Sequence, residues 1–196
     1  MKLVVDWDGT ATEVDGLYEV IRAFGDERIY EDTEDRLGEL TLNDVIEIEV
    51  ATVTAPLPEV VAWVLENVRL RAGFLELARR HRPLVVSSSF HELIGPVVER
   101  EGLSLEICAN RLDARPDGWR AHFREGVTCE ECSETCKRSD VAGLDGFVYV
   151  GDGVSDNCVA LAASRVFARD GLARYLEARG VAFEAFEDFH DVMRAV

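Results

Sequence analysis

Two aspartates one residue apart stand at the first point where this chain could do chemistry. A short apolar run, Leu3 to Val5, predicts a buried strand, and it leads directly into Asp6 and Asp8. The carboxyl ends of parallel strands form the functional edge of such a sheet. Two carboxylates there suit Mg²⁺, a hard cation whose charge offsets theirs. Taken alone, however, these residues fit an Asx-turn after an edge strand equally well.

Two further predicted strands also end in polar residues. Ser87 and Ser88 follow one apolar run, and Asp152 and Asp156 follow another through a Gly-Asp-Gly turn. Lys137 lies between them, and the sequence has only one other lysine among its 21 basic residues. Each feature alone has an ordinary explanation as a helix cap, a turn or a solvated side chain. Together they provide cation ligands, donors for phosphate oxygens, a positive charge and a carboxylate that can attack phosphorus.

The elements that must position these residues follow from the hydrophobic pattern. Residues 15–70 have apolar residues at helical spacing and no good strand, which predicts an inserted, all-helical cap domain. Within the cap, the acidic stretch 26–38 is weakly patterned and predicts a surface connection. Strands alternate with helices elsewhere, which predicts an α/β core domain, a doubly wound parallel sheet formed by residues 1–14 and 71–196. The polar stretch 111–136 predicts a small hairpin or a metal-stabilised loop.

Composition limits the classes of partner. The chain has 196 residues, of which 47% are hydrophobic and 30% charged, as in ordinary globular enzymes. A net charge of -17 argues against nucleic acid and anionic membrane surfaces as partners. No apolar run is long enough to span a bilayer or to act as a signal peptide, so we expect a cytoplasmic protein. We expect this protein to be a monomer or a homodimer.

Five cysteines form a second chemical feature of the sequence. Three are closely spaced: Cys129, Cys132 and Cys136. Their spacing suits zinc thiolates, but a closed zinc site needs four ligands. His122 and Cys108 are candidates for the fourth, whereas Cys158 fits a buried helix position. The alternative is a set of reduced cysteines packed beside the active site, since an odd cysteine number without a secretion signal does not indicate disulfides.

The strand-end motifs, in this order, resemble the haloacid dehalogenase (HAD) superfamily of phosphatases. The resemblance rests on residues 6–10 (Asp-Trp-Asp-Gly-Thr), Ser87, Lys137 and residues 151–156 (Gly-Asp-Gly-Val-Ser-Asp), and it covers nearly the whole chain. An all-helical cap between the first two motifs is similar to that of the phosphoserine phosphatase branch. Residues 87–90, Ser-Ser-Ser-Phe, depart from the Ser-Gly-Gly-Phe common in that branch.

A closer resemblance is to the methionine-salvage phosphatases that act on 2-hydroxy-3-keto-5-methylthiopentenyl 1-phosphate. It rests on residues 71–74, 166–170 and 186–189 and on the cysteine run 129–136 before the lysine. A cysteine run that ends directly in a lysine is also similar to the phosphoethanolamine/phosphocholine phosphatases. The resemblance therefore implies a small-molecule phosphate ester as substrate, with these esters and phosphoserine as the candidates.

The resemblance also implies a two-step phosphoryl transfer. Asp6 would attack phosphorus to give an aspartyl-phosphate. Asp8 would protonate the leaving oxygen and then activate water. The Asp6 carboxylate, the Asp8 backbone carbonyl and Asp152 would hold Mg²⁺, and Asp156 would order a metal-bound water.

The implied phosphate cradle and the candidate substrate contacts complete the predicted site. Ser87, the backbone amide of Ser88 and Lys137 would neutralise the phosphoryl oxygens. Asp15 and Arg71 are candidate substrate contacts, although Asp15 is also a good helix cap.

Two functions of other kinds compete with a phosphatase. One is a catalytically weak scaffold protein that binds metal at the cysteine loop. The other is a switch in which Asp6 is phosphorylated but not turned over. The full set of catalytic residue types argues against the first, and Asp8, placed to activate water, argues against the second.

Overall fold

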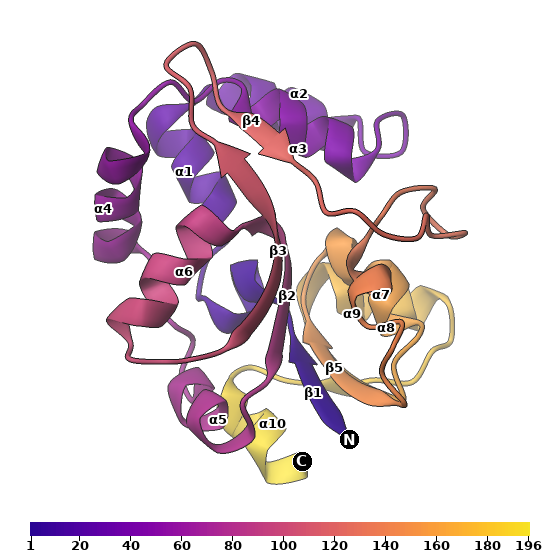
Figure 1. Ribbon diagram of the computed structural model, residues 1–196. Coiled ribbons are helices and arrows are strands. Elements are labelled where there is room, and N and C mark those ends of the chain that lie inside the picture. Colours follow the sequence, from indigo (N-terminus) through magenta and orange to yellow (C-terminus); the bar gives the residue numbers. More distant parts are fainter.

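A computed structural model describes all 196 residues as a seven-stranded sheet with helices on both faces (Figure 1). The strands are β1 (Lys2–Val5), β2 (Leu84–Phe90), β3 (Glu106–Asp113), β4 (Arg120–His122), β5 (Phe147–Gly151), β6 (Arg165–Ala168) and β7 (Glu184–Ala185). The α-helices are α1 (Gly16–Phe24), α2 (Glu27–Asp35), α3 (Leu42–Val50), α4 (Leu57–Asn67), α5 (Phe74–His81), α6 (His91–Arg100), α7 (Lys137–Asp140), α8 (Asn157–Ala160), α9 (Asp170–Ala178) and α10 (Phe189–Ala195). Two short turns of helix, η1 (Trp7–Ala11) and η2 (Val154–Asp156), follow β1 and β5.

The sheet has the order β4-β3-β2-β1-β5-β6-β7, and all pairs are parallel except β3 with β4. The chain builds outward from β1 in one direction through β2 and β3, and in the other through β5 and β6. The strand order therefore reverses at β1, and the crevice beyond the carboxyl ends of β1, β2 and β5 is the expected ligand position in an open α/β sheet. The predicted doubly wound sheet is confirmed.

Both faces of the sheet are buried, as the continuous apolar runs of its strands require. In β1, Leu3 and Val5 belong to the larger core and Val4 to the smaller one, because successive side chains of a strand point to opposite faces. The larger core contains residues of α5, α6 and α10, and the smaller one contains residues of α8 and α9. The central strand is thus fixed from both sides.

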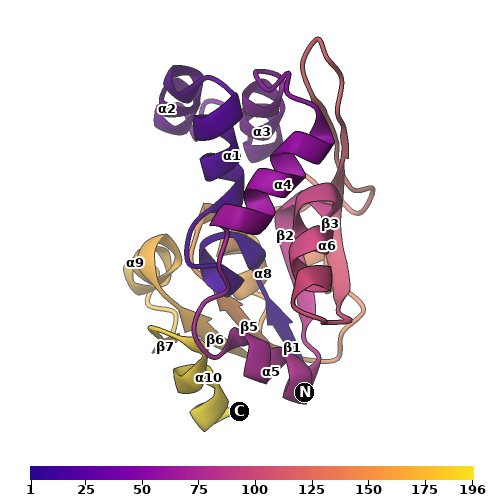
Figure 2. The same ribbon diagram turned by 90° about the vertical axis from the view of Figure 1, so that its left-hand side faces the viewer.

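Helices α1 to α4 lie together beyond one end of the sheet, above the carboxyl ends of the strands (Figure 2). This arrangement agrees with the predicted helical cap. The core also supports the cap away from the two linkers: α4 packs against α6, and the buried Trp119 of the β3–β4 hairpin donates from Nε1 to the Ala55 carbonyl at 3.0 Å. The cap is therefore held against the core at several points.

One prediction within the cap is wrong. Residues 26–38 contain the helix α2 rather than only a connection. Asp26 caps this helix by accepting from the Arg28 amide, and the buried Thr33 hydroxyl donates to Glu49 of α3 at 2.8 Å. Such a helix is difficult to predict from an acidic, weakly patterned sequence, because packing against α3 rather than intrinsic helix propensity stabilises it.

Other elements follow the predictions with shifted ends. The hairpin expected within 111–136 is present as β3 and β4, and it leaves residues 123–136 without helix or strand. The three serines lie within β2 and not after it, on a stretch where its register with β3 shifts. No helix is both long and apolar enough to cross a membrane.

Candidate active site

A buried ion-pair cluster lies where β1 and β5 end side by side. The Lys137 ammonium, at the start of α7, donates to Asp6 Oδ1 at 2.5 Å and to Asp156 Oδ1 at 2.7 Å. Lys137 is only 1% exposed, and both carboxylates are buried. Burial lowers the pKa of the Lys137 ammonium, but the neighbouring Asp156 and Asp6 carboxylates outweigh that effect and raise it. This lysine is therefore a fixed positive charge.

Both carboxylate oxygens of Asp156 accept hydrogen bonds from the protein. Its Oδ1 accepts from Lys137 and from the Tyr149 hydroxyl, and its Oδ2 accepts from the Asp152 and Gly153 amides at 2.8 and 3.0 Å. A carboxylate with both oxygens engaged in this way has little capacity left to bind a cation directly. Asp156 instead fixes the turn after β5 and the position of Lys137.

Asp152 lies beside the loop after β1. The Thr10 hydroxyl donates to its Oδ1, and a Cβ built on Gly9 would lie 2.6 Å from its Oδ2. Gly9 also has a φ of 72°, so only glycine fits this position without strain. The glycine in the Asp-Trp-Asp-Gly-Thr motif therefore lets Asp152 approach the first loop closely.

The cluster carries more negative charge than the protein neutralises. One oxygen from each of Asp6, Asp152 and Asp156 lies within 4.8 Å of the others, and Lys137 is their one cationic partner. Burial and the charges of Asp156 and Asp152 raise the pKa of Asp6 well above its usual range, although Lys137 opposes this. Burial and Asp156 raise the pKa of Asp152 to about 6. Hard oxygen ligands with unneutralised charge fit Mg²⁺, with Asp6 and Asp152 as the carboxylates free to bind it.

Asp8 lies in the first loop, between the start of α1 and the serines of β2. Its Oδ1 accepts from the Gly16 amide at 3.0 Å, and its Oδ2 accepts from the Ser87 hydroxyl at 3.3 Å. Burial, and next the charge of Asp15, raise the pKa of Asp8 to about 7. A carboxyl group with such a pKa can donate and accept a proton at neutral pH.

The three serines of β2 line the same cavity as Asp6 and Asp8. Ser87 Oγ accepts from the Ser89 amide at 3.0 Å, and the Ser88 carbonyl accepts from Asn110 Nδ2 at 2.7 Å. Arg124 donates to the Ser87 carbonyl and forms an ion pair with Asp140 of α7 at 3.3 Å. These contacts hold the serine stretch and the lysine-bearing helix in one arrangement.

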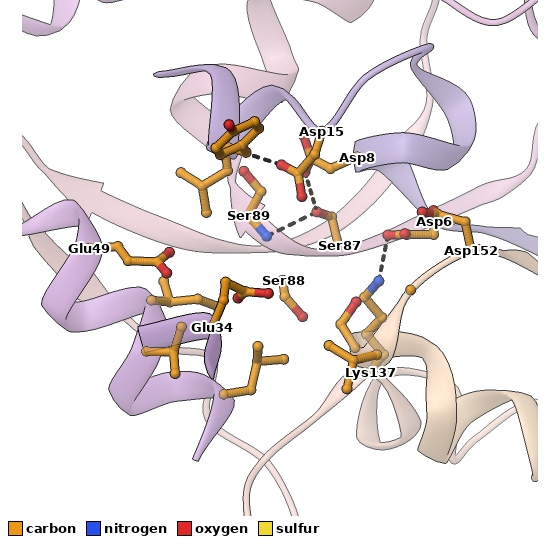
Figure 3. Close-up of a pocket in the computed structure, with 18 of the residues that line it drawn as sticks. Asp6, Asp8, Asp15, Glu34, Glu49, Ser87, Ser88, Ser89, Lys137 and Asp152 are labelled. Atoms are coloured by element: carbon orange, nitrogen blue, oxygen red, sulfur yellow. Dashed lines mark hydrogen bonds and ion pairs between the residues drawn. The ribbon is translucent and has the colours of Figure 1, made fainter. Parts of the chain in front are cut away.

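A cavity of about 230 Å³ joins these groups to the cap (Figure 3). The core contributes Asp6, Asp8, Lys137 and Asp152, together with Ser87, Ser88 and Ser89. The cap contributes three acids, two tyrosines and four aliphatic residues: Asp15, Glu34, Glu49, Tyr18, Tyr30, Leu17, Leu42, Val45 and Ile46. Figure 3 shows the carboxylates of Glu34 and Glu49 across the cavity from Asp6 and Lys137.

The haloacid dehalogenase-like hydrolase family model matches residues 3–161, which includes every strand-end residue described above. The chain belongs to this family. It is accordingly an enzyme, as predicted, and the expected HAD-type phosphatase fold and its class of reaction are confirmed.

Two bacterial relatives are similar along almost their whole length. A protein of an Exiguobacterium species is 27% identical over 97% of this chain and 94% of its own. One of Geobacillus kaustophilus is 28% identical over 99% of this chain and 94% of its own. Both carry the name 2-hydroxy-3-keto-5-methylthiopentenyl-1-phosphate phosphatase.

Solved structures of other proteins have the same fold. A phosphoserine phosphatase, described as a phospho-aspartyl intermediate analogue, superposes with a TM-score of 0.73, at 20% identity, over 100% of this chain and 98% of its own. A HAD family hydrolase from Salmonella enterica serovar Typhi superposes with a TM-score of 0.77, at 14% identity, over 97% of this chain and 69% of its own.

The two candidate substrate contacts lie in different places. Asp15 lines the cavity, and it also caps α1, because its Oδ1 accepts from the Tyr18 amide at 2.9 Å. Arg71 is not part of the lining. Its guanidinium donates to the carbonyls of Gly9 at 2.6 Å and Thr10 at 2.9 Å. Arg71 therefore supports the first HAD loop from outside the cavity.

The cysteine loop directly precedes Lys137, and none of its cysteines lines the cavity. One sulfur each from Cys129, Cys132, Cys136 and Cys158 lies within 4.8 Å of the others, and all five cysteines are free thiols. The fourth thiol is thus Cys158 of α8, and neither Cys108 nor His122 belongs to the group. Cys158 was missed because the contact depends on how α8 follows η2, which spacing along the chain does not reveal.

Several other site residues were missed for the same kind of reason. These are Thr10, Tyr149, Glu34, Glu49 and Arg124. Thr10 is part of the Asp-Trp-Asp-Gly-Thr motif, so its position offered a signal. Glu34 offered none, because α2 itself was not predicted, and nothing in the sequence shows that Glu49 of α3 faces the cavity.

Proposed function

We propose that this chain is a Mg²⁺-dependent phosphatase that hydrolyses a small-molecule phosphate monoester through an aspartyl-phosphate on Asp6. The observation that carries the proposal is the setting of Asp6 at the end of β1. Its carboxylate is 2.5 Å from the Lys137 ammonium, belongs to one cluster with Asp152 and faces the cavity. A buried carboxylate beside a fixed positive charge is suited to attack phosphorus, since the approaching phosphoryl oxygens meet a cation.

In the first step, an Asp6 Oδ forms a bond to phosphorus while the ester oxygen leaves. Asp8 gives that oxygen its proton, so the alcohol departs neutral. The Gly16 amide and the Ser87 hydroxyl hold the Asp8 carboxyl toward the cavity at 3.0 and 3.3 Å. The pKa of about 7 leaves a large share of Asp8 protonated at neutral pH.

In the second step, Asp8 is the base. It takes a proton from water, the water oxygen bonds to phosphorus, and the Asp6 carboxylate leaves. Asp8 is then protonated again, and inorganic phosphate is released. When the ester is bound, the Ser87 hydroxyl would donate to a phosphoryl oxygen in place of Asp8, and the Ser88 amide and Lys137 bind the phosphoryl oxygens in both steps. Bound Mg²⁺, held by Asp6, Asp152 and the Asp8 carbonyl, would supply charge neutralisation for the phosphoryl group.

The first substrate candidate is 2-hydroxy-3-keto-5-methylthiopentenyl 1-phosphate. Relatives that carry its name match this chain from end to end at 27 and 28% identity. The aliphatic lining from Leu17, Leu42, Val45 and Ile46 suits an uncharged chain with a thioether, and the acids of the cap can accept from its hydroxyl group.

A second candidate is an amino-alcohol phosphate such as phosphoethanolamine or phosphocholine. The cap places Asp15, Glu34 and Glu49 on the cavity, and none of them has an ion-pair partner. Tyr18 and Tyr30 lie beside them, with ring centroids 4.5 Å apart. Carboxylates and aromatic faces together favour a cationic group.

Phosphoserine is the weakest of the three candidates. Its carboxylate needs a cationic partner, and the one basic residue on the cavity, Lys137, is already bound to Asp6 and Asp156. The three cap acids would repel a carboxylate at that end of the cavity.

A comparison of kcat/KM over these esters tests the proposal. We expect Mg²⁺-dependent phosphate release, with phosphoserine at least about tenfold poorer than the best ester. Phosphoserine as the best substrate would overturn the argument from the cap acids, and no release from any ester with Mg²⁺ would overturn the proposed function.

Zinc at the cysteine loop is a second metal that we propose for this chain. Its site is separate from the Mg²⁺ carboxylates, because the thiols lie outside the cavity lining.

A further inference from the structure

Four thiols from two separate segments meet at one point of the core domain. Cys129, Cys132 and Cys136 come from the loop 123–136, and Cys158 comes from α8. Their sulfurs lie within 4.8 Å of one another, and none is in a disulfide. Zn–S bonds of about 2.3 Å place the sulfurs of a tetrahedral site about 3.8 Å apart. The four thiols are therefore close to zinc-binding geometry.

The ligand set defines the metal and its role. Four thiolates are soft ligands, which select zinc over the magnesium of the neighbouring carboxylate cluster. A site with four protein ligands has no open position for water or substrate, so such a zinc is structural. Binding releases the thiol protons to solvent.

The loop has little else to hold it. Residues 123–136 form neither helix nor strand, and Cys129 is their only buried residue. A tight turn, in which the Cys129 amide donates to the Glu134 carbonyl and the Ser133 amide to the Cys129 carbonyl, both at 2.8 Å, folds the segment back on itself. A loop of this length with almost no core is uncommon unless something else orders it.

The same loop contacts both halves of the proposed active site. Cys136 directly precedes Lys137, and Cys158 is two residues after Asp156, the partner of Lys137 at 2.7 Å. Between the cysteines, the Glu134 carboxylate accepts from the Leu42 and Asn43 amides at 3.1 Å each. These amides begin α3, the cap helix that contributes Leu42, Val45, Ile46 and Glu49 to the cavity.

We propose that Cys129, Cys132, Cys136 and Cys158 bind one structural Zn²⁺ that cross-links the loop to α8 and thereby positions Lys137 against Asp6 and Asp156 and α3 over the cavity. The effect on Lys137 rests on the proposed function, whereas zinc binding does not. Lys137 is a phosphate-binding residue, and the cysteines are positioning residues that act through it and through Glu134.

Metal analysis of the purified chain, prepared without added zinc, tests the site directly. We expect about one zinc per chain, and a Co²⁺-substituted sample with the sulfur-to-cobalt charge-transfer bands and the visible bands of a tetrahedral thiolate site. A chain without zinc that gives no such bands with Co²⁺ would overturn the proposal, as would iron in place of zinc or four cysteines oxidised in disulfides.

Matched cysteine variants test which residues bind the metal. Cys158→Ser should bind zinc at least about tenfold more weakly and unfold at a lower temperature. Cys108→Ser is the control, because Cys108 is half-buried in β3 outside the group, and it should keep one zinc. Full zinc affinity in Cys158→Ser, or equal loss in both variants, would contradict the assignment.

Kinetics separate this proposal from the proposed function. With Mg²⁺ in excess, removing zinc from the wild type should lower kcat several-fold and returning zinc should restore it. Asp6→Asn should bind zinc like the wild type while losing activity. Zinc bound as expected in a chain without phosphatase activity would refute the proposed function alone, and activity that never responds to zinc would refute the positioning role.

Discussion

Two groups of three carboxylates lie in or beside one cavity, one at the strand ends and one on the cap, and the protein treats them differently. Asp6, Asp152 and Asp156 at the strand ends receive an ammonium, two hydroxyls and two backbone amides. Of the cap acids, Asp15 and Glu49 accept hydrogen bonds from the protein, and neither they nor Glu34 has a cationic partner. The first group is organised for a reaction that is the same for every phosphate ester. The carboxylates of the second group have no cationic partner, so they can attract or repel the organic part of an ester and thereby discriminate among substrates.

Changing the strand-end group should have the largest effect. Asp6→Asn removes the nucleophile while keeping the shape of the side chain, so we expect phosphate release with Mg²⁺ to fall at least about 10³-fold. The fold should persist, because asparagine can still accept from Lys137. Asp145→Asn, at an exposed aspartate before β5, is the control and should stay fully active. Near wild-type turnover in Asp6→Asn would exclude the covalent route.

Lys137→Arg should have the next largest effect, with a loss of about 10²-fold in kcat/KM. The ammonium sits between carboxylates at 2.5 and 2.7 Å and is 1% exposed, so the larger guanidinium fork cannot occupy the same point. Arg138→Lys makes the reverse exchange at the exposed neighbouring residue and should leave kcat/KM unchanged. Equal kinetics for Lys137→Arg and the wild type would place this lysine outside the site.

Glu49→Gln tests the cap group through the pH dependence of stability. Burial raises the pKa of Glu49 to about 7 from its ordinary value of 4.5, so the folded chain binds this proton more tightly than the unfolded chain. The wild type therefore loses stability as the pH rises through this window, and the variant, which cannot ionise, does not. At about pH 8 we expect the variant to be about 1 kcal/mol more stable, and the gain should vanish near pH 4.

Glu47→Gln provides the control for that measurement, because Glu47 is exposed on the same helix. Urea unfolding at several pH values would show the difference between the two variants. A Glu49→Gln gain that does not change with pH would mean that ionisation of Glu49 is not its cause.

Substitutions of Asp15 should have the smallest effect, and they distinguish its two possible roles as a substrate contact and a helix cap. Asp15→Ala removes the helix cap and costs about 1 kcal/mol of stability. Asp15→Asn keeps a capping oxygen and removes only the charge. If Asp15 contacts substrate, both variants lower kcat/KM for the best metabolite several-fold and leave an aryl phosphate unaffected. A lower melting temperature in Asp15→Ala with unchanged kinetics in both would leave Asp15 as a cap alone.

The contrast between the strand-end carboxylates and the cap acids also explains which parts of the site the sequence could predict. Residues at strand ends, such as Asp6 and Asp152, are brought together by the parallel sheet itself, and an apolar run followed by an acid marks each of them. The sheet and the helical composition of the cap were therefore predictable, and the family and fold are confirmed. Local spacing also marked the three loop cysteines.

The rest depends on packing between elements distant in sequence. Glu34 reaches the cavity because α2 packs on α3, and α2 lacks an apolar pattern from which it could be predicted. Arg71 was predicted near substrate, but its guanidinium binds backbone carbonyls of the first loop. Cys158 joins the other thiols only because η2 leads the chain from the end of β5 into α8. No periodicity along the chain encodes these contacts.

The most direct test of the central claim is to trap the phosphorylated enzyme. Asp8→Asn should still accept the phosphoryl group from an ester with a good leaving group, such as an aryl phosphate, and should lose the base for the second step, so the intermediate accumulates. After acid quenching, borohydride reduces an acyl phosphate to an alcohol, and mass spectrometry locates the reduced residue. We predict reduction at Asp6, dependent on substrate and Mg²⁺. Reduction at another residue, or none despite a burst of released alcohol, would contradict Asp6 as the nucleophile.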